Sequence, residues 1–131
     1  MLYDIRQVTE YSYASPVPFA RQVLRLLPVD RPGQRVVACE LSIRPQPTER
    51  HDTRDFFGNW LTTVAFSFPH SELRLETRAR VLVEATEAPL PMLSPPFELI
   101  RRNAVAESDL GPLSPVHFLF PSRLVALDEE I

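Results

Sequence analysis

The sequence predicts an all-β protein built as an antiparallel β-sandwich. Three observations predict it. Several segments alternate polar and apolar residues with a period of two, turn-forming residues separate these segments, and no long stretch is convincingly helical. A closed barrel is the alternative that the same pattern allows. The 131 residues suffice for one domain with a substantial core.

The alternating segments define the expected strands. Segment 72–84 is the clearest, because Leu73, Leu75 and Val81 share one side while charged residues occupy the other. Similar alternation predicts strands within 2–13, 20–28 and 59–68. Segment 35–45 also alternates, and its predicted inward residues are Val37, Cys39, Leu41 and Ile43.

Turn signals lie between these segments. Residues 30–33 combine aspartate, proline and glycine, and Gly58-Asn59 indicates a tight reversal. Ser15-Pro16 and residues 69–71 mark further breaks, and residues 45–52 are expected to form a longer polar loop.

Proline divides the chain near residue 86. There are 14 prolines and only 3 glycines, and the prolines are dense at Pro89, Pro91, Pro95 and Pro96. Proline fixes φ and removes a backbone donor, so this region cannot be a central strand or a long helix. We therefore expect a β-sandwich over 1–85 and a proline-rich extension over 86–131, in which 97–106 can form a short helix.

Composition excludes several classes of function. The net charge is −3 and the sequence has no lysine and no basic run, so we expect no nucleic-acid partner. One cysteine allows neither an internal disulfide nor a four-ligand zinc site. No signal peptide or membrane-spanning stretch is visible, so we expect a cytoplasmic protein without a membrane partner.

Candidate catalytic and metal-binding residues have simpler structural interpretations. Cys39 is predicted to be a small buried hydrophobe, and a hydrolase that uses it as nucleophile is the competing hypothesis. Glu49, His51, Asp52 and Asp55 could ligate a metal, but arginines in the same loop favour a solvated, self-paired cluster. We therefore predict no catalytic residue, no metal site and no cofactor. His70 and His117 are predicted to be structural or surface residues.

The stretch 55–59 carries the most specific information. Gly58 permits a turn, while Asp55 and Asn59 can hydrogen-bond the turn backbone. Phe56 and Phe57 are expected to point to opposite faces. The functional interpretation is a loop that docks on another domain.

These residues belong to a wider pattern that resembles a known family. Over residues 3–84 the sequence is similar to the N-terminal β-rich region of bacterial transglutaminase-like proteins. One departure is Gln7, where relatives commonly carry histidine. The resemblance rests on Tyr3-x-Ile5, Thr9-x-Tyr11-x-Tyr13, Pro16-Val17, Leu24-Arg25-Leu26-x-Pro28, Gly33-Gln34 and Asp55-x-Phe57-Gly58-Asn59.

The resemblance implies a role for the chain within a parent protein. Residues 118–125 resemble the segment that leads into the family's catalytic core, and residues 128–131 resemble the first turn of a further helix. In the family that core carries a Cys-His-Asp triad for acyl transfer or amide hydrolysis through a thioester. Cys39 does not match the core cysteine, so any such activity would belong to the parent chain.

The expected function is therefore a non-catalytic accessory domain that orients or covers a downstream catalytic domain of the same chain. Self-association through the exposed C-terminal segment is a further expectation. The alternative is a free-standing module that binds a protein or peptide. The residues predicted to dock are Asp55, Phe57, Gly58, Asn59, Phe118 and Phe120.

Overall fold

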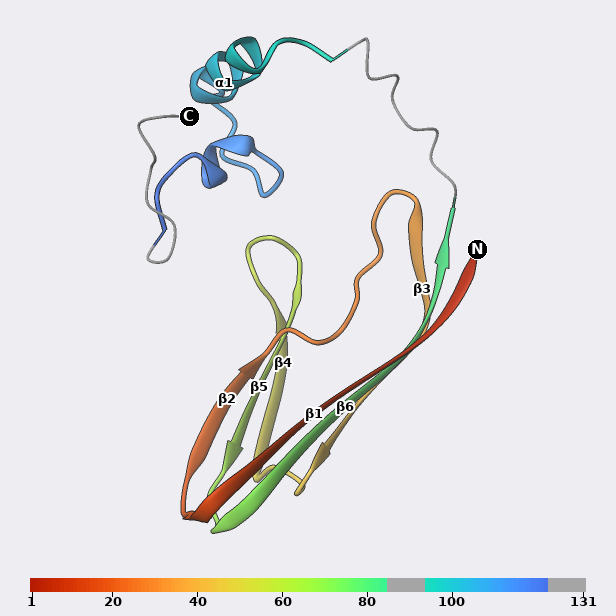
Figure 1. Cartoon of the computed structure of the whole chain (residues 1–131), viewed down its shortest axis with the longest axis vertical. Helices are drawn as coiled ribbons and strands as arrows, with labels where there is room; N and C mark the ends of the chain where they lie inside the picture. The colour runs from red at the N-terminus through yellow and green to blue at the C-terminus, as the bar shows by residue number, and fades with distance from the viewer. Residues whose placement is uncertain (85–93, 123–131) are drawn as a thin grey trace. The chain divides into compact units, whose positions relative to one another are not determined.

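A computed structural model describes residues 1–84 and 94–122 of the chain. The chain divides into two compact units, Met1–Thr86 and Glu87–Ile131. The first unit contains every strand of the described residues, and the second contains their helical segments (Figure 1). Outside the described residues lie Pro89 and Pro91 of the proline-rich region, the end of the segment 118–125, and the expected first helical turn at 128–131.

The first unit consists of two antiparallel three-stranded sheets, so the predicted all-β sandwich is confirmed. One sheet has the strand order β1-β6-β3, and the other has the order β2-β5-β4. Figure 1 shows β1 and β6 running side by side as long strands. The strands are β1 (Leu2–Val17), β2 (Ala20–Leu24), β3 (Gln34–Arg44), β4 (Glu49–Arg54), β5 (Trp60–Phe66) and β6 (His70–Val83).

The alternation of β6 produces the core face of the first sheet as predicted. Its residues from Leu73 to Val81 are buried at odd positions, while Arg78 and Arg80 are exposed on the other side. Thr77 is buried within this face, and its hydroxyl has no hydrogen-bond partner among the described residues. Gln7 lies opposite Thr77 in the register of β1 and β6, so it occupies the same face.

The core lies between the two sheets. Its fully enclosed members Val64 and Phe66 come from β5, and both have 0% exposure. Burying each such side chain stabilises the fold by about 1.5–3 kcal/mol, so this cluster is the main reason why the sheets pack face to face. The buried cluster is Leu24, Leu41, Val64, Phe66, Leu73 and Leu75.

Two strand boundaries differ from expectation. Strand β1 continues through Ser15-Pro16 to Val17, with a register irregularity between Ser12 and Val17 that accommodates the proline. Residues 49–54, expected to lie in a loop, form β4. This strand has no apolar alternation because it is an edge strand that pairs through its backbone with β5.

The second unit contains helix α1 (Phe97–Ala106) and the 3-10 turn η2 (Pro115–Phe118). The helix has the predicted bounds and begins immediately after Pro96, and none of its residues is buried. Among the described residues of this unit, Ser114 is the buried one, and its hydroxyl accepts a hydrogen bond from the Val116 amide at 3.4 Å. No helix within the described residues is long and apolar enough to cross a membrane.

Candidate docking site

The loop Asp55–Asn59 joins β4 to β5 as a short hairpin connection. The last paired residues of the two strands are Arg54 and Trp60. The Asp55 amide donates to the Asn59 carbonyl at 3.0 Å, and the Gly58 amide donates to the Asp55 carbonyl at 2.9 Å. Gly58 has φ +77°, a left-handed conformation that glycine adopts without steric cost. The predicted turn and its requirement for glycine are therefore present.

The Asp55 carboxylate organises the loop. It accepts hydrogen bonds from the Asn59 amide at 2.9 Å, from Asn59 Nδ2 at 3.2 Å and from Arg25 Nε at 3.2 Å. Burial acts to raise the pKa of Asp55, but the bonds from Asn59 and Arg25 outweigh it and hold the pKa below the ordinary 3.8. The ionised carboxylate thus ties the hairpin to the residue that follows β2.

Two further arginines brace the same loop. Arg31 Nη2 donates to Asn59 Oδ1 at 3.0 Å, and Arg54 Nη1 donates to the Gly58 carbonyl at 2.6 Å. The Arg54 guanidinium also lies 3.9 Å from the centre of the Trp60 ring, within the range of a cation–π contact. Sequence reasoning did not identify Arg25 and Arg31 as partners of this loop, because nothing in their local sequence encodes contacts across 28 to 30 positions.

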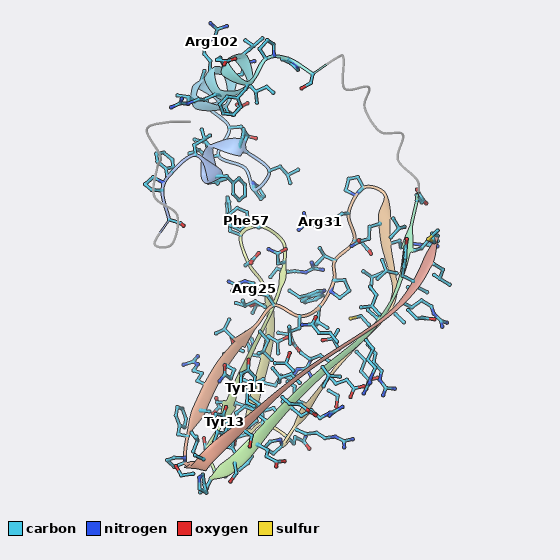
Figure 2. The ribbon with its side chains drawn as sticks, in the orientation of Figure 1. Tyr11, Tyr13, Arg25, Arg31, Phe57 and Arg102 are labelled. Carbon is cyan, nitrogen blue, oxygen red and sulfur yellow. The ribbon has the colours of Figure 1, made fainter. Side chains whose placement is uncertain are left out.

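The tip of the loop presents two aromatic rings. Phe56 is 57% exposed and Phe57 is 40% exposed, and their rings meet edge to face with centres 5.1 Å apart. Figure 2 shows Phe57 at the loop tip and Arg25 near the loop base. The expectation that the rings point to opposite faces is wrong. They occupy a turn, where the alternation of an extended strand does not apply.

The structure brings together four of the predicted docking residues, Asp55 and Phe57–Asn59. Phe118 and Phe120 belong to the second unit, where Phe118 ends η2. Their side chains are 71% and 73% exposed. Within this unit, His117 Nε2 lies 3.1 Å from the carbonyl oxygens of both Leu110 and Gly111, which fixes the turn locally.

Cys39 is exposed, so the expectation of a buried core cysteine is wrong. It lies opposite Ala79 in the sheet, on the core-facing side, but the packed cluster reaches Leu41 and stops short of Cys39. A strand irregularity between Val36 and Ala38 precedes it. Partial burial nevertheless raises the pKa of the thiol above 9.0, which is the opposite of what a nucleophilic thiolate requires.

The other titratable candidates are dispersed. His51 and Asp52 are neighbours in an extended strand, so their side chains leave β4 on opposite faces. Asp52 is engaged by the Thr62 hydroxyl, whose hydrogen bond is the main reason why the pKa of Asp52 is lowered. Within residues 1–84 and 94–122, no three His, Cys, Asp or Glu side chains gather as metal ligands would.

His70 has a structural environment. It is buried, its Nδ1 lies 3.0 Å from the Phe68 carbonyl oxygen, and its ring contacts Tyr13, Phe66 and Phe68. Such aromatic contacts stabilise a core and leave the imidazole no access to a substrate.

Comparison with known proteins assigns a family to this fold. The family model described as the bacterial transglutaminase-like N-terminal region matches residues 3–82, which is more than half of the chain. No curated protein and no solved structure matches the chain.

Proposed function

Because the chain belongs to the family of bacterial transglutaminase-like N-terminal regions, we propose that it is a non-catalytic accessory domain. In this role it packs against a downstream catalytic core with a Cys-His-Asp triad and orients or covers that core. The acyl-transfer or amidase chemistry resides in the core. The braced loop Asp55–Asn59 supports this proposal most directly.

The loop has the properties of a preformed contact. Hydrogen bonds from Arg25, Arg31 and Arg54 reach it from three segments of the chain. These bonds fix the backbone under the rings of Phe56 and Phe57 before any partner binds. A contact that is already ordered loses less conformational entropy on binding, and large aromatic side chains provide much of the energy of protein interfaces.

The chemistry of the described residues also favours an accessory role. Cys39 is the single thiol of the sequence, and the pKa of this thiol is raised rather than lowered. His70 is enclosed by aromatic rings, and His51 lies on a charged edge strand. A catalytic triad requires a nucleophile and a base within hydrogen-bonding reach. The environments of Cys39, His70 and His51 do not favour such a pair, so thiol-dependent amidase or transamidase activity of this chain alone would contradict the proposal.

Binding to a transglutaminase-like catalytic domain from the same genome tests the docking loop. We expect Phe57→Ala to raise the dissociation constant by about tenfold or more, since a truncated interface aromatic commonly costs that much. Phe19→Ala is the matched control, because Phe19 is also an exposed phenylalanine (59%) and precedes β2, at the end of the strand opposite to Arg25. Equal affinities for wild type and Phe57→Ala would show that the loop does not dock.

A free-standing peptide-binding module is the second candidate, and the exposed edge of β1 favours it. Removal of residues 97–131 separates the two functions. A peptide-binding sandwich should retain its binding and remain monodisperse. An accessory domain should lose affinity for the core, because the exposed rings of Phe118 and Phe120 are removed with the segment.

A further inference from the structure

Four strands of the sandwich lie at sheet edges, and three of them carry features that discourage pairing. Strand β2 has only 5 residues, β4 is dominated by charged residues, and β3 has an irregularity between Val36 and Ala38. Strand β1 is different, because it pairs with β6 without interruption from Leu2 to Ser12. A long regular edge strand is a template for another strand.

The alternation of the ladder shows which backbone groups of β1 face its free edge. Met1 and Val83 exchange both hydrogen bonds, with the Val83 amide 2.8 Å from the Met1 carbonyl and the Met1 amino group donating to the Val83 carbonyl. Hydrogen-bonded pairs alternate in an antiparallel ladder, so odd residues of β1 bond to β6. The amides and carbonyls of the even residues therefore point outward.

The side chains along this edge form a pattern that can pair with itself. The even positions Asp4, Arg6, Val8 and Glu10 lie on the outer face of the sheet, with Val8 37% exposed. On the opposite face, Ile5 is 47% exposed and Tyr11 is 45% exposed. On the outer face, Arg6 and Glu10 carry opposite charges and lie two positions to either side of Val8.

We infer that the free edge of β1 pairs antiparallel with β1 of a second copy of this chain, with Val8 on the two-fold axis. Arg6 then lies opposite the partner's Glu10, and Glu10 lies opposite the partner's Arg6. On the other face Ile5 lies opposite the partner's Tyr11. Opposite charges and aromatic–β-branched pairs at directly facing positions both stabilise a sheet, and the two-fold symmetry repeats each pair.

Other registers are less favourable. The outward backbone groups belong to even residues, so an even residue must face an even residue of the partner. Only registers whose two-fold axis passes through a residue position meet this condition. Moving the axis from Val8 to position 7 brings Asp4 opposite the partner's Glu10, and moving it to position 9 brings Arg6 opposite the partner's Ser12. An axis at Arg6 or at Glu10 opposes like charges. An axis at Ile5 pairs Asp4 with the partner's Arg6 but uses only Leu2–Val8.

The charged side chains remain available for this pairing. Arg6 uses Nε to bond Glu76 at 2.8 Å, and its side chain is 57% exposed. A guanidinium has five N–H donors, so Arg6 can bond the partner's Glu10 while it keeps Glu76. Glu10 pairs with Arg74, and its side chain is 63% exposed.

Sedimentation of the full chain tests the inferred dimer. We expect twice the 15.0 kDa mass of one chain at high micromolar concentration. Arg6→Glu places like charges at both ends of the pairing and should raise the dimer dissociation constant by at least about tenfold. The double variant Arg6→Glu/Glu10→Arg restores opposite charges and should restore the dimer. Arg21→Glu, with the same charge change on β2, should leave it intact.

Backbone and cysteine variants test the strand pairing and its register. Val8→Pro removes an outward amide that β6 does not use, so it should abolish the dimer and leave the monomer folded by circular dichroism. In a Cys39→Ser background, Val8→Cys should form a disulfide-linked dimer, because facing Cα atoms lie about 5.5 Å apart. In the Ser12→Cys variant the two cysteines lie far apart in this register, so this variant should not form a disulfide-linked dimer.

Three results would overturn the inference. The first is a monomer at every concentration. The second is a dimer that survives both Arg6→Glu and Val8→Pro, which would locate self-association elsewhere. Loss of that dimer on changing Phe118 and Phe120 to alanine would assign it to the C-terminal segment. The third is cross-linking of Ser12→Cys as fast as that of Val8→Cys, which would exclude the proposed register.

Discussion

Replacing Gly58 with alanine isolates the backbone conformation of the docking loop. The Cβ of an alanine at this position would meet no heavy atom within 4 Å, so the substitution adds no steric overlap with neighbouring residues. What remains is the conformational cost at φ +77°. An L-residue in the left-handed region costs about 1–2 kcal/mol, because its Cβ crowds its own backbone.

The expected net effect is smaller than the full strain. Alanine also restricts the unfolded chain, which offsets about 0.4–1 kcal/mol. We therefore expect Gly58→Ala to lower the free energy of unfolding by about 1 kcal/mol, and to lower Tm by about 4–8 °C for a cooperative unit of 60–100 residues. Urea unfolding followed by circular dichroism measures the first quantity, and a thermal scan measures the second.

Gly58→Asn is the matched control, because asparagine tolerates the left-handed region better than alanine does. It should retain most of the stability of the wild type. If Gly58→Ala unfolds at the wild-type Tm, or if Gly58→Asn is as destabilised as Gly58→Ala, the left-handed conformation of residue 58 does not set the cost of the substitution.

The remaining predictions concern the core, the charged face and the thiol. Phe66→Ala should destabilise the sandwich by about 3–5 kcal/mol in urea titrations, because Phe66 has 0% exposure, and Val23→Ala should change stability by less than about 0.5 kcal/mol. Hydrogen bonds from Arg6, Arg78 and Arg74 lower the pKa of Glu76 from 4.5, so its stabilising contribution is complete above pH 4.5 and is lost as the pH falls toward the lower folded-state value. Glu76→Gln should flatten the fall in stability over that acid range, and an unchanged slope would exclude this cause. Burial raises the pKa of Cys39, so alkylation at neutral pH should be slower than in the urea-unfolded chain and should accelerate as the pH rises. Equal alkylation rates for the folded and the urea-unfolded chain would contradict the raised pKa of Cys39.

The sheet face of β6 illustrates where sequence reasoning succeeds. A period-two pattern determines which side chains share a face, and Leu73, Leu75 and Val81 are buried as expected. The same reasoning missed β4, because its charged residues show no apolar face. It is a strand through backbone pairing with β5, and side-chain patterning does not report backbone pairing along an edge.

Cys39 shows the limit of face assignment. The alternation of 35–45 correctly places it on the core-facing side with Leu41, which is 7% exposed. The pattern cannot state how far the opposing sheet extends along that face. Coverage depends on the packing of segments distant in the sequence, so Leu41 is buried while Cys39, two residues earlier, is exposed.

The sequence by itself determined the β class, the position of the short helix, the turn at Gly58 and the family resemblance. These features depend on local periodicity, on the φ preference of glycine and on motif spacing, which are properties of neighbouring residues. Only the tertiary structure placed Arg25 and Arg31 beside the docking loop, and only the strand order left β1 at a free edge. Both depend on which distant segments meet, and the free energy of that choice comes from the shared core between the sheets.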